Sequence, residues 1–144
     1  MTEEIYKICE DIRTILLNSE FNREIRSSII DNYCMLGVNT SVAVRSSATA
    51  EDLEDASFAG QQDTYLNISG EDNVLLSVKK CMVSLWNDRA VIYRMKNNID
   101  HRNVGISVVV QVLVNAKVAG VMFTSNPITS CRKEIVIGAN EGLG

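Results

Sequence analysis

Arg45 and its neighbours carry the clearest potential for binding chemistry in this sequence. A strand-like run, residues 41–45, ends on this arginine, and two hydroxyl residues, Ser46 and Ser47, follow directly. A guanidinium offers planar, charged donors that suit phosphate oxygens. About fifteen residues later, Gly60 lies among small and polar residues, where backbone N–H groups can approach an anion closely. The pattern therefore predicts an anion site of the phosphate-binding kind.

The residues alone leave a second interpretation of Arg45 open. It is also consistent with a surface arginine that forms ion pairs with the acidic residues Glu51, Asp52 or Asp55. Neither the G-x-x-x-x-G-K-[ST] loop nor the G-x-G-x-x-G loop occurs in the sequence, so the two common nucleotide-loop patterns give no support.

Gln111 is the second candidate for binding chemistry. It is an amide inside an otherwise apolar, valine-rich run, residues 106–114. A buried amide needs hydrogen-bond partners, so it is consistent with a satisfied core glutamine or with one that faces outward. A third interpretation places it at the rim of an adenine pocket, where the strand backbone contacts the base edge and apolar neighbours pack on its faces.

Hydrophobic periodicity predicts the elements that must position these residues. Ser69 with Asp72, and Asp88, are the expected helix caps. We expect the strand over 106–114 to be buried on both faces and to form a hairpin with the next strand. Helices are segregated from strand pairs, which favours an α+β fold. The expected elements are helices 3–18, 21–36, 71–86 and 89–97, strands 41–45, 63–68, 106–114, 118–124 and 134–137, and a long ordered loop, 46–60.

Composition indicates one globular domain. The 144 residues are 46% hydrophobic and 22% charged, which excludes a disordered chain, a collagen and a coiled-coil rod. A net charge of −4 and a pI near 5.0 argue against nucleic acid or a membrane as partner, and no apolar run is long enough to span a bilayer. The four scattered cysteines and the single histidine favour free thiols in the cytoplasm over a zinc site.

Two long motifs closely resemble the N-terminal ATP-binding domain of the phosphoenolpyruvate synthase family. They are residues 42–53, VAVRSSATAEDL, and residues 55–67, DASFAGQQDTYLN. Residues 118–127 and 140–144 match the same family in the same order. The family includes pyruvate phosphate dikinase and the rifampicin phosphotransferases. The resemblance covers roughly residues 3–144.

The resemblance implies part of an ATP-grasp-like domain that is truncated at both ends, with a helical part over 1–40 and an ATP-grasp-like part over 41–144. Enzymes of this family convert ATP, pyruvate and water to AMP, phosphoenolpyruvate and phosphate through a phosphohistidine on a separate swivelling domain. The alternatives are a rifampicin phosphotransferase, in which the antibiotic is the acceptor, and a truncated module that is inactive on its own. We favour the synthase role.

Carried over by motif position, the resemblance implies a role for five residues. Arg45 is similar to the catalytic arginine that holds the ATP phosphates, Gly60 and Thr64 to phosphate contacts, and Gln111 and Val112 to the strand residues beside the adenine. The Mg²⁺ ligands of the family would lie outside this chain, so we expect no metal site in it and no activity from it alone. His101 matches no phosphocarrier motif, and we expect it at the surface.

The same truncation leads us to expect unpaired strand edges and exposed apolar surface. In isolation the chain should therefore aggregate or form a homodimer.

Overall fold

The computed structural model describes residues 2–37, 39–48, 52–53, 56–57 and 63–142. The chain divides into two compact units, Met1–Leu113 and Val114–Gly144, and each is considered by itself. Among the described residues, no helix combines the length and the apolar character that crossing a bilayer requires. The elements confirm an α+β fold.

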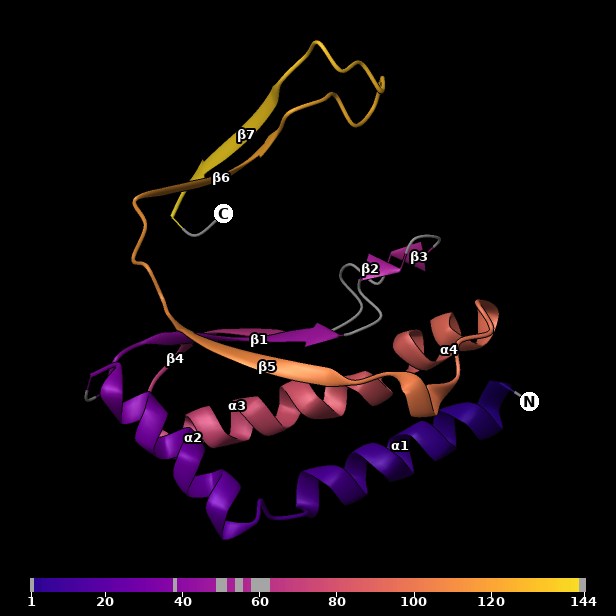
Figure 1. Cartoon of the computed structure of the whole chain (residues 1–144), viewed down its shortest axis with the longest axis vertical. Helices are drawn as coiled ribbons and strands as arrows, with labels where there is room; N and C mark the ends of the chain where they lie inside the picture. Colours follow the sequence, from indigo (N-terminus) through magenta and orange to yellow (C-terminus); the bar gives the residue numbers. More distant parts are fainter. Residues whose placement is uncertain (1, 38, 49–51, 54–55, 58–62, 143–144) are drawn as a thin grey trace. The chain divides into compact units, whose positions relative to one another are not determined.

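Helices build one side of the first unit. In Figure 1, α3 (Glu71–Val83) lies between the strands and the pair α1 (Thr2–Asn18) and α2 (Arg23–Met35). Asn22 begins α2, because its side-chain oxygen accepts the Ile25 N–H at 2.8 Å, a helix cap of the usual kind. The shorter elements that follow α3 are η1 (Ser84–Trp86), α4 (Asp88–Lys96) and η2 (His101–Asn103).

The sheet of the first unit has three antiparallel strands in the order β4 (Thr64–Ile68), β1 (Val42–Ala48) and β5 (Ile106–Val112). A separate two-stranded ladder joins β2 (Asp52–Leu53) to β3 (Ala56–Ser57). β1 is longer than expected, and it includes Ser46 and Ser47. The Ser46 hydroxyl donates to the Asp63 carbonyl at 3.1 Å, so this polar residue is satisfied inside the sheet.

The core lies where α3 covers the sheet. Val42 and Val44 point from β1 toward α3, where Val74, Val78 and Cys81 meet them, and all five are buried. Because successive strand residues face opposite sides, Ala43, Arg45 and Ser47 belong to the other face. Burial of the first set therefore fixes which side of the sheet presents Arg45.

The outer edge at β4 is interrupted by a bulge. The register runs from Val44 opposite Tyr65 to Val42 opposite Ile68, so one extra residue lies on β4. Asn67 takes up the irregularity with a φ of 57°, a conformation that asparagine tolerates better than most residues. A bulge of this kind ends regular pairing along an edge.

β5 differs from expectation in two respects. It is not buried on both faces, because it is an edge strand of alternating burial with Val109 and Val112 45% and 47% exposed. Its expected hairpin with the next strand is also wrong. β6 (Val118–Phe123) pairs instead with β7 (Val136–Glu141). Alternation along a strand shows that it is a strand, but it does not select its partner.

The second unit is this antiparallel hairpin. Its register runs from Val118 opposite Glu141 to Phe123 opposite Val136. The loop between the strands is held by Asn126, whose side-chain oxygen accepts the N–H groups of Ile128 and Thr129 at 2.9 and 3.1 Å. Asparagine commonly organises a turn in this way.

Two expected helix caps are each wrong by one residue. Gly70, with a φ of 85°, begins α3 in place of the Ser69 and Asp72 pair. Asn87 precedes α4, which starts at Asp88 itself. The Asn87 amide does not cap the helix, because it is oriented toward the Asp63 carboxylate at 3.5 Å. A tertiary contact has replaced the local one.

Tyr33 ties the start of β1 to the start of α3. Its hydroxyl donates to the Thr40 carbonyl and accepts the Gly70 N–H, both at 2.9 Å, and the residue is buried. Removing the hydroxyl leaves two backbone groups without this partner. We expect Tyr33→Phe to lower the free energy of unfolding by about 1–2 kcal/mol.

Chemical denaturation measures this loss. The matched control is Tyr6→Phe, because the Tyr6 side chain is 41% exposed and should change stability by less than about 0.5 kcal/mol. Equal effects of the two substitutions would show that the Tyr33 hydroxyl contributes nothing specific.

Candidate functional site

The open face of the sheet brings Arg45 together with residues from both neighbouring strands. Arg45 lies directly opposite Thr64 on β4 and Val109 on β5, and Gln111 lies opposite Ala43. Paired residues of antiparallel strands project from the same face. Arg45, Thr64 and Gln111 therefore share one surface, although the first and the last are 66 positions apart in the sequence.

A groove of about 240 Å³ lies on this face, which we call the Arg45 groove. Sites that enclose a whole small ligand span roughly 300–1,000 Å³, so this groove can hold only part of a nucleotide-sized ligand. Its apolar wall is Val109, and its polar groups come from β1 and from Gln111. It is lined by Arg45, Ser46, Ser47, Val109 and Gln111.

The guanidinium of Arg45 is exposed. No hydrogen bond or ion pair joins it to another residue within the described part of the chain. Its charged donors are therefore available to an anion, and it would bind a phosphate group in a planar, two-pronged geometry.

The other predicted site residues differ in exposure and in the face of the sheet on which their side chains lie. Thr64 is exposed and next to Arg45 across the ladder, and Gln111 faces outward, not into the core. Gly60 lies outside the described residues. Val112 pairs with Val42, so its side chain belongs to the opposite face from Arg45.

What Val112 can offer is its backbone. The Leu113 N–H donates to the Ser41 carbonyl at 2.9 Å, and hydrogen-bonding direction alternates along an antiparallel strand. The N–H and C=O of Val112 therefore point to the outer edge of β5. This arrangement is compatible with contact to the edge of a flat ring.

Asp63 is a residue that sequence reasoning missed. Its carbonyl oxygen accepts from Ser46 and from the Cys81 thiol, the latter at 3.5 Å. Its carboxylate accepts the Tyr65 hydroxyl at 3.1 Å and lies 3.5 Å from an Arg89 nitrogen. One residue thus ties β1, β4, α3 and α4 together.

The Asp63 carboxylate contributes to raised pKa values of two neighbouring side chains. Burial, and then the nearby Asp63 carboxylate, raise the pKa of Tyr65 to about 12. The same two causes, in the same order, raise the pKa of Cys81 to about 11. Both side chains are therefore neutral donors near pH 7. Asp63 lies within the motif over residues 55–67, but that motif does not show that distant elements converge on it.

His101 is half-buried, which corrects the expectation of a surface residue. Its Nδ1 accepts the Arg94 Nε–H at 2.9 Å, and Arg94 is only 1% exposed. The Arg94 guanidinium also lies 5.5 Å from the centre of the Trp86 ring. Its two terminal nitrogens have no hydrogen-bond partner among the described residues.

The contact between His101 and Arg94 predicts that the folded chain loses stability in acid. Burial and then the Arg94 charge lower the pKa of His101, while Asp100 opposes them. Its folded pKa therefore lies below the unfolded value of about 6.5, so below that pH the unfolded chain binds more protons. The contribution of neutral His101 to the free energy of unfolding is complete above pH 6.5. It is lost as the pH falls toward the folded pKa.

Urea unfolding at pH 7.5 and pH 5.5 tests this. His101 is the only histidine of the chain, so few other groups titrate in this interval. His101→Asn keeps an acceptor but cannot become charged, and it should reduce the pH dependence. A wild-type midpoint that is the same at both pH values would show that the prediction is wrong.

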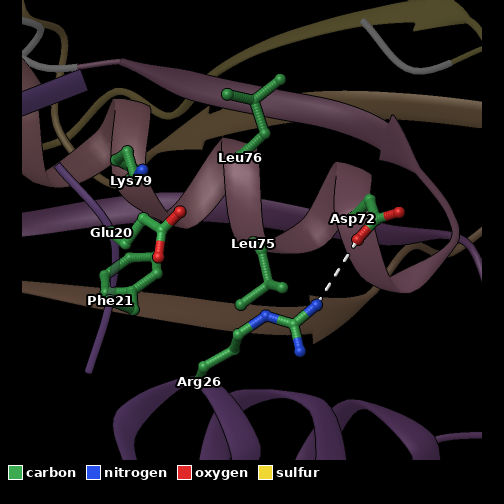
Figure 2. A pocket seen from close by; sticks show the side chains of 7 residues that line it. All are labelled: Glu20, Phe21, Arg26, Asp72, Leu75, Leu76 and Lys79. Carbon is green, nitrogen blue, oxygen red and sulfur yellow. Dashed lines mark ion pairs between the residues drawn. The ribbon is translucent and has the colours of Figure 1, made fainter. Parts of the chain in front are cut away.

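A further pocket lies between α2 and α3 and is unrelated to the Arg45 groove (Figure 2). Its cations already have internal partners. Lys79 donates to the Leu17 and Ser19 carbonyls at the end of α1, and Arg26 lies 3.8 Å from Asp72. We assign it a structural role, in which Lys79 holds α1 against α3.

Within the described ranges, no group of three or more His, Cys, Asp or Glu side chains could hold a metal ion. Mg²⁺ requires near-octahedral oxygen ligation, and the polar residues of the Arg45 groove do not supply it. The described residues therefore do not fit a magnesium site.

The comparisons with known proteins agree on one family. The model of the pyruvate phosphate dikinase AMP/ATP-binding domain matches residues 1–144. The rifampicin phosphotransferase of Bacillus cereus is 49% identical over 142 residues, which is 99% of this chain and 16% of the relative. The phosphoenolpyruvate synthase of Pyrococcus furiosus is 50% identical over 140 residues, 94% of this chain and 17% of the relative.

The chain thus spans about a sixth of the length of these relatives. The family match nevertheless extends along the entire chain. The chain belongs to the family of the pyruvate phosphate dikinase AMP/ATP-binding domain.

Proposed function

We propose that the Arg45 groove holds the phosphates of ATP in a phosphotransferase of the phosphoenolpyruvate synthase type. The observation that supports this is Arg45 itself. It is an exposed guanidinium without an ion-pair partner among the described residues, and it shares one face of the sheet with Thr64 and Gln111. The chain belongs to the family of an AMP/ATP-binding domain, and this membership makes ATP the natural ligand.

Arg45 acts as an electrostatic clamp in this proposal. Phosphoryl transfer depends mainly on positioning and on neutralising the charge of the phosphates. The strand fixes the backbone of Arg45, but its exposed side chain loses rotamer freedom when it binds. Thr64, on the neighbouring strand, contributes a hydroxyl to the same phosphates, and the segment around Gly60 contributes backbone N–H groups.

The adenine lies toward Gln111 and the outward backbone of Val112. Apolar contact with Val109 would flank the base, while the edge of β5 supplies one donor and one acceptor. The nucleotide would then run along the open face, with its base near β5 and its phosphates near Arg45.

The reaction we propose for the longer protein is the conversion of ATP, pyruvate and water to AMP, phosphoenolpyruvate and phosphate. A histidine on a separate swivelling domain carries the phosphoryl group, and Mg²⁺ is held by residues outside this chain. A rifamycin-type antibiotic is the alternative acceptor, because the two kinds of relative match this chain equally well, at 49% and 50% identity. The chain alone is a binding module without turnover.

Titration of the full chain tests the proposal. ATP and tripolyphosphate should bind and compete for one site, and adenosine should bind more weakly, because the charged contacts belong to the phosphates. No AMP should form. Binding of neither ATP nor tripolyphosphate at millimolar concentration would refute the phosphate site. AMP formation would refute the assignment of the chain as an inactive module.

A further inference from the structure

Asp63 holds the start of β4 through its backbone carbonyl. It directly precedes Thr64, and Ser46, which directly follows Arg45, donates its hydroxyl to the Asp63 carbonyl at 3.1 Å. The residues that flank the Arg45 and Thr64 pair are thus joined across the ladder. The Asp63 carbonyl shares a rigid peptide plane with the Thr64 nitrogen, so this hydrogen bond also limits where Thr64 can lie.

The Asp63 carboxylate is anchored on the helical side of the sheet. It accepts the Tyr65 hydroxyl at 3.1 Å, and its Oδ1 lies 3.5 Å from the Asn87 Nδ2 and 3.5 Å from an Arg89 nitrogen, both at the start of α4. Tyr65 packs against the core between the sheet and α3, whereas Thr64 is exposed on the face of Arg45. The carboxylate therefore lies on the opposite face from Thr64, and its negative charge does not face the Arg45 groove.

The location of β4 makes such an anchor important. β4 is a five-residue strand at the edge of the sheet, and a bulge interrupts its pairing with β1. At its far end, the Ser41 hydroxyl donates to the Asn67 side chain at 2.8 Å, whereas Asp63 holds the end that carries Thr64. Short strands with few pairings open more readily than the centre of a sheet. The placement of Thr64 relative to Arg45 therefore depends on the contacts of Asp63.

We infer that Asp63 is a positioning residue for phosphate binding, which holds the Thr64 hydroxyl where it can bind the same phosphates as Arg45. The inference rests on the proposed function of the Arg45 groove. Asp63 acts through the backbone of Thr64 and does not itself contact the phosphates. Donors that are already in place bind a ligand without a further loss of conformational freedom, so an anchor on the opposite face of the sheet can change the affinity.

Asp63→Asn tests the inference, because it keeps the size of the side chain and removes the charge that holds Tyr65 and Arg89. We expect the affinity of the full chain for tripolyphosphate, measured by NMR titration, to fall about five- to tenfold, since one hydrogen bond to a charged phosphate is weakened. Tyr65→Phe removes a single contact of the carboxylate and keeps the ring in the core. It should lower the same affinity about threefold.

Asp88→Asn is the matched control. Asp88 is the first residue of α4, it lies 2.6 Å from an Arg13 nitrogen, and it is not among the residues that line the Arg45 groove. Its loss should reduce stability as an ion pair would, but change the affinity for tripolyphosphate by less than about twofold. Titrations are made where urea unfolding shows each variant to be folded, so a loss of stability alone cannot lower the affinity.

A double-mutant cycle with Thr64→Val provides a readout that a purely structural role would not change. Thr64→Val removes the hydroxyl and keeps the branched shape, and alone it should weaken tripolyphosphate binding about tenfold. If Asp63 acts through this hydroxyl, Asp63→Asn should lower the affinity by less than about twofold once the hydroxyl is absent. A structural role would give the same loss in both backgrounds.

The results distinguish this inference from the proposed function. If Arg45→Gln weakens tripolyphosphate binding but Asp63→Asn binds like the wild type, the positioning role is refuted and the phosphate site stands. Equal losses in Asp63→Asn and Asp88→Asn, or additive effects in the cycle, would refute the role as well. Should Asp63→Asn not fold, wild-type affinity in Tyr65→Phe refutes it. If the wild type does not bind tripolyphosphate at millimolar concentration, the proposed function fails and the inference fails with it.

Discussion

Replacing Arg45 with glutamine is expected to weaken ATP binding thirty- to a hundredfold. Charge-assisted hydrogen bonds to phosphate contribute about 1.5–3 kcal/mol, and no other described residue of the Arg45 groove carries a positive charge. Because the side chain is exposed and makes no hydrogen bond or ion pair to another described residue, its removal should leave the stability of the fold nearly unchanged. The loss should therefore appear in binding and not in unfolding.

A series of ligands locates the effect. Under the proposal, Arg45→Gln should reduce the affinity for tripolyphosphate and ATP most, and leave adenosine unchanged. Arg45→Lys should be intermediate, because it keeps the charge but loses the planar fork. NMR titration follows these dissociation constants into the millimolar range.

Arg26→Gln is the matched control. Arg26 is an exposed arginine on α2, and its one ion pair to another described residue is long, at 3.8 Å to Asp72. It should bind ATP like the wild type, because it lies outside the Arg45 groove. If Arg45→Gln also binds ATP with unchanged affinity, the phosphate assignment must be abandoned, whatever the family of the chain.

The sequence predicted the elements of the fold well wherever the signal was local. Periodicity located α1 and α2 to within two residues at each end, and the change of period after residue 37 marked the first strand. The α+β class followed from the order of these elements. Each of these inferences used residues that are close together in the chain.

Contacts between distant segments could not be read in this way. A strand over 118–124 was expected, but its partner was not, because pairing depends on a chain reversal through the loop around Asn126. The contact between Arg94 and His101 was also missed. A histidine in a polar stretch looks exposed until the helix that carries Arg94 is placed against it.

The candidate site also combines residues that local sequence identified with contacts that only the fold reveals. The residue type and position of Arg45 were enough to select it, and its family resemblance gave its neighbours. That Thr64 and Gln111 share its face follows only from the antiparallel register of three strands. Asp63 lies within the motif over residues 55–67, but its contacts with four elements follow only from the folded chain.

Gly120→Ala is expected to open the hairpin of the second unit. Gly120 lies opposite Ala139, and a Cβ at this position would lie 2.4 Å from the Gly138 carbonyl oxygen and 3.1 Å from the Ala139 Cα. Backbone atoms cannot move aside as a flexible side chain can. The clash should destabilise the pairing of β6 with β7 by about 3 kcal/mol.

Gly138→Ala is a control of the same chemistry on the partner strand. A Cβ at position 138 would meet no atom within 4 Å. The substitution should be neutral or stabilise the hairpin by up to about 1 kcal/mol, because alanine reduces the conformational entropy of the open state.

Hydrogen exchange in β6 and β7 separates the two variants. Protection in the hairpin should fall about a hundredfold in Gly120→Ala and be retained in Gly138→Ala. The amides of β1 serve as an internal reference, because Gly120 pairs only with β7. Equal protection in both variants would mean that the close approach at Gly120 does not determine this pairing. The register of β6 against β7 would then rest on its alternating apolar side chains alone.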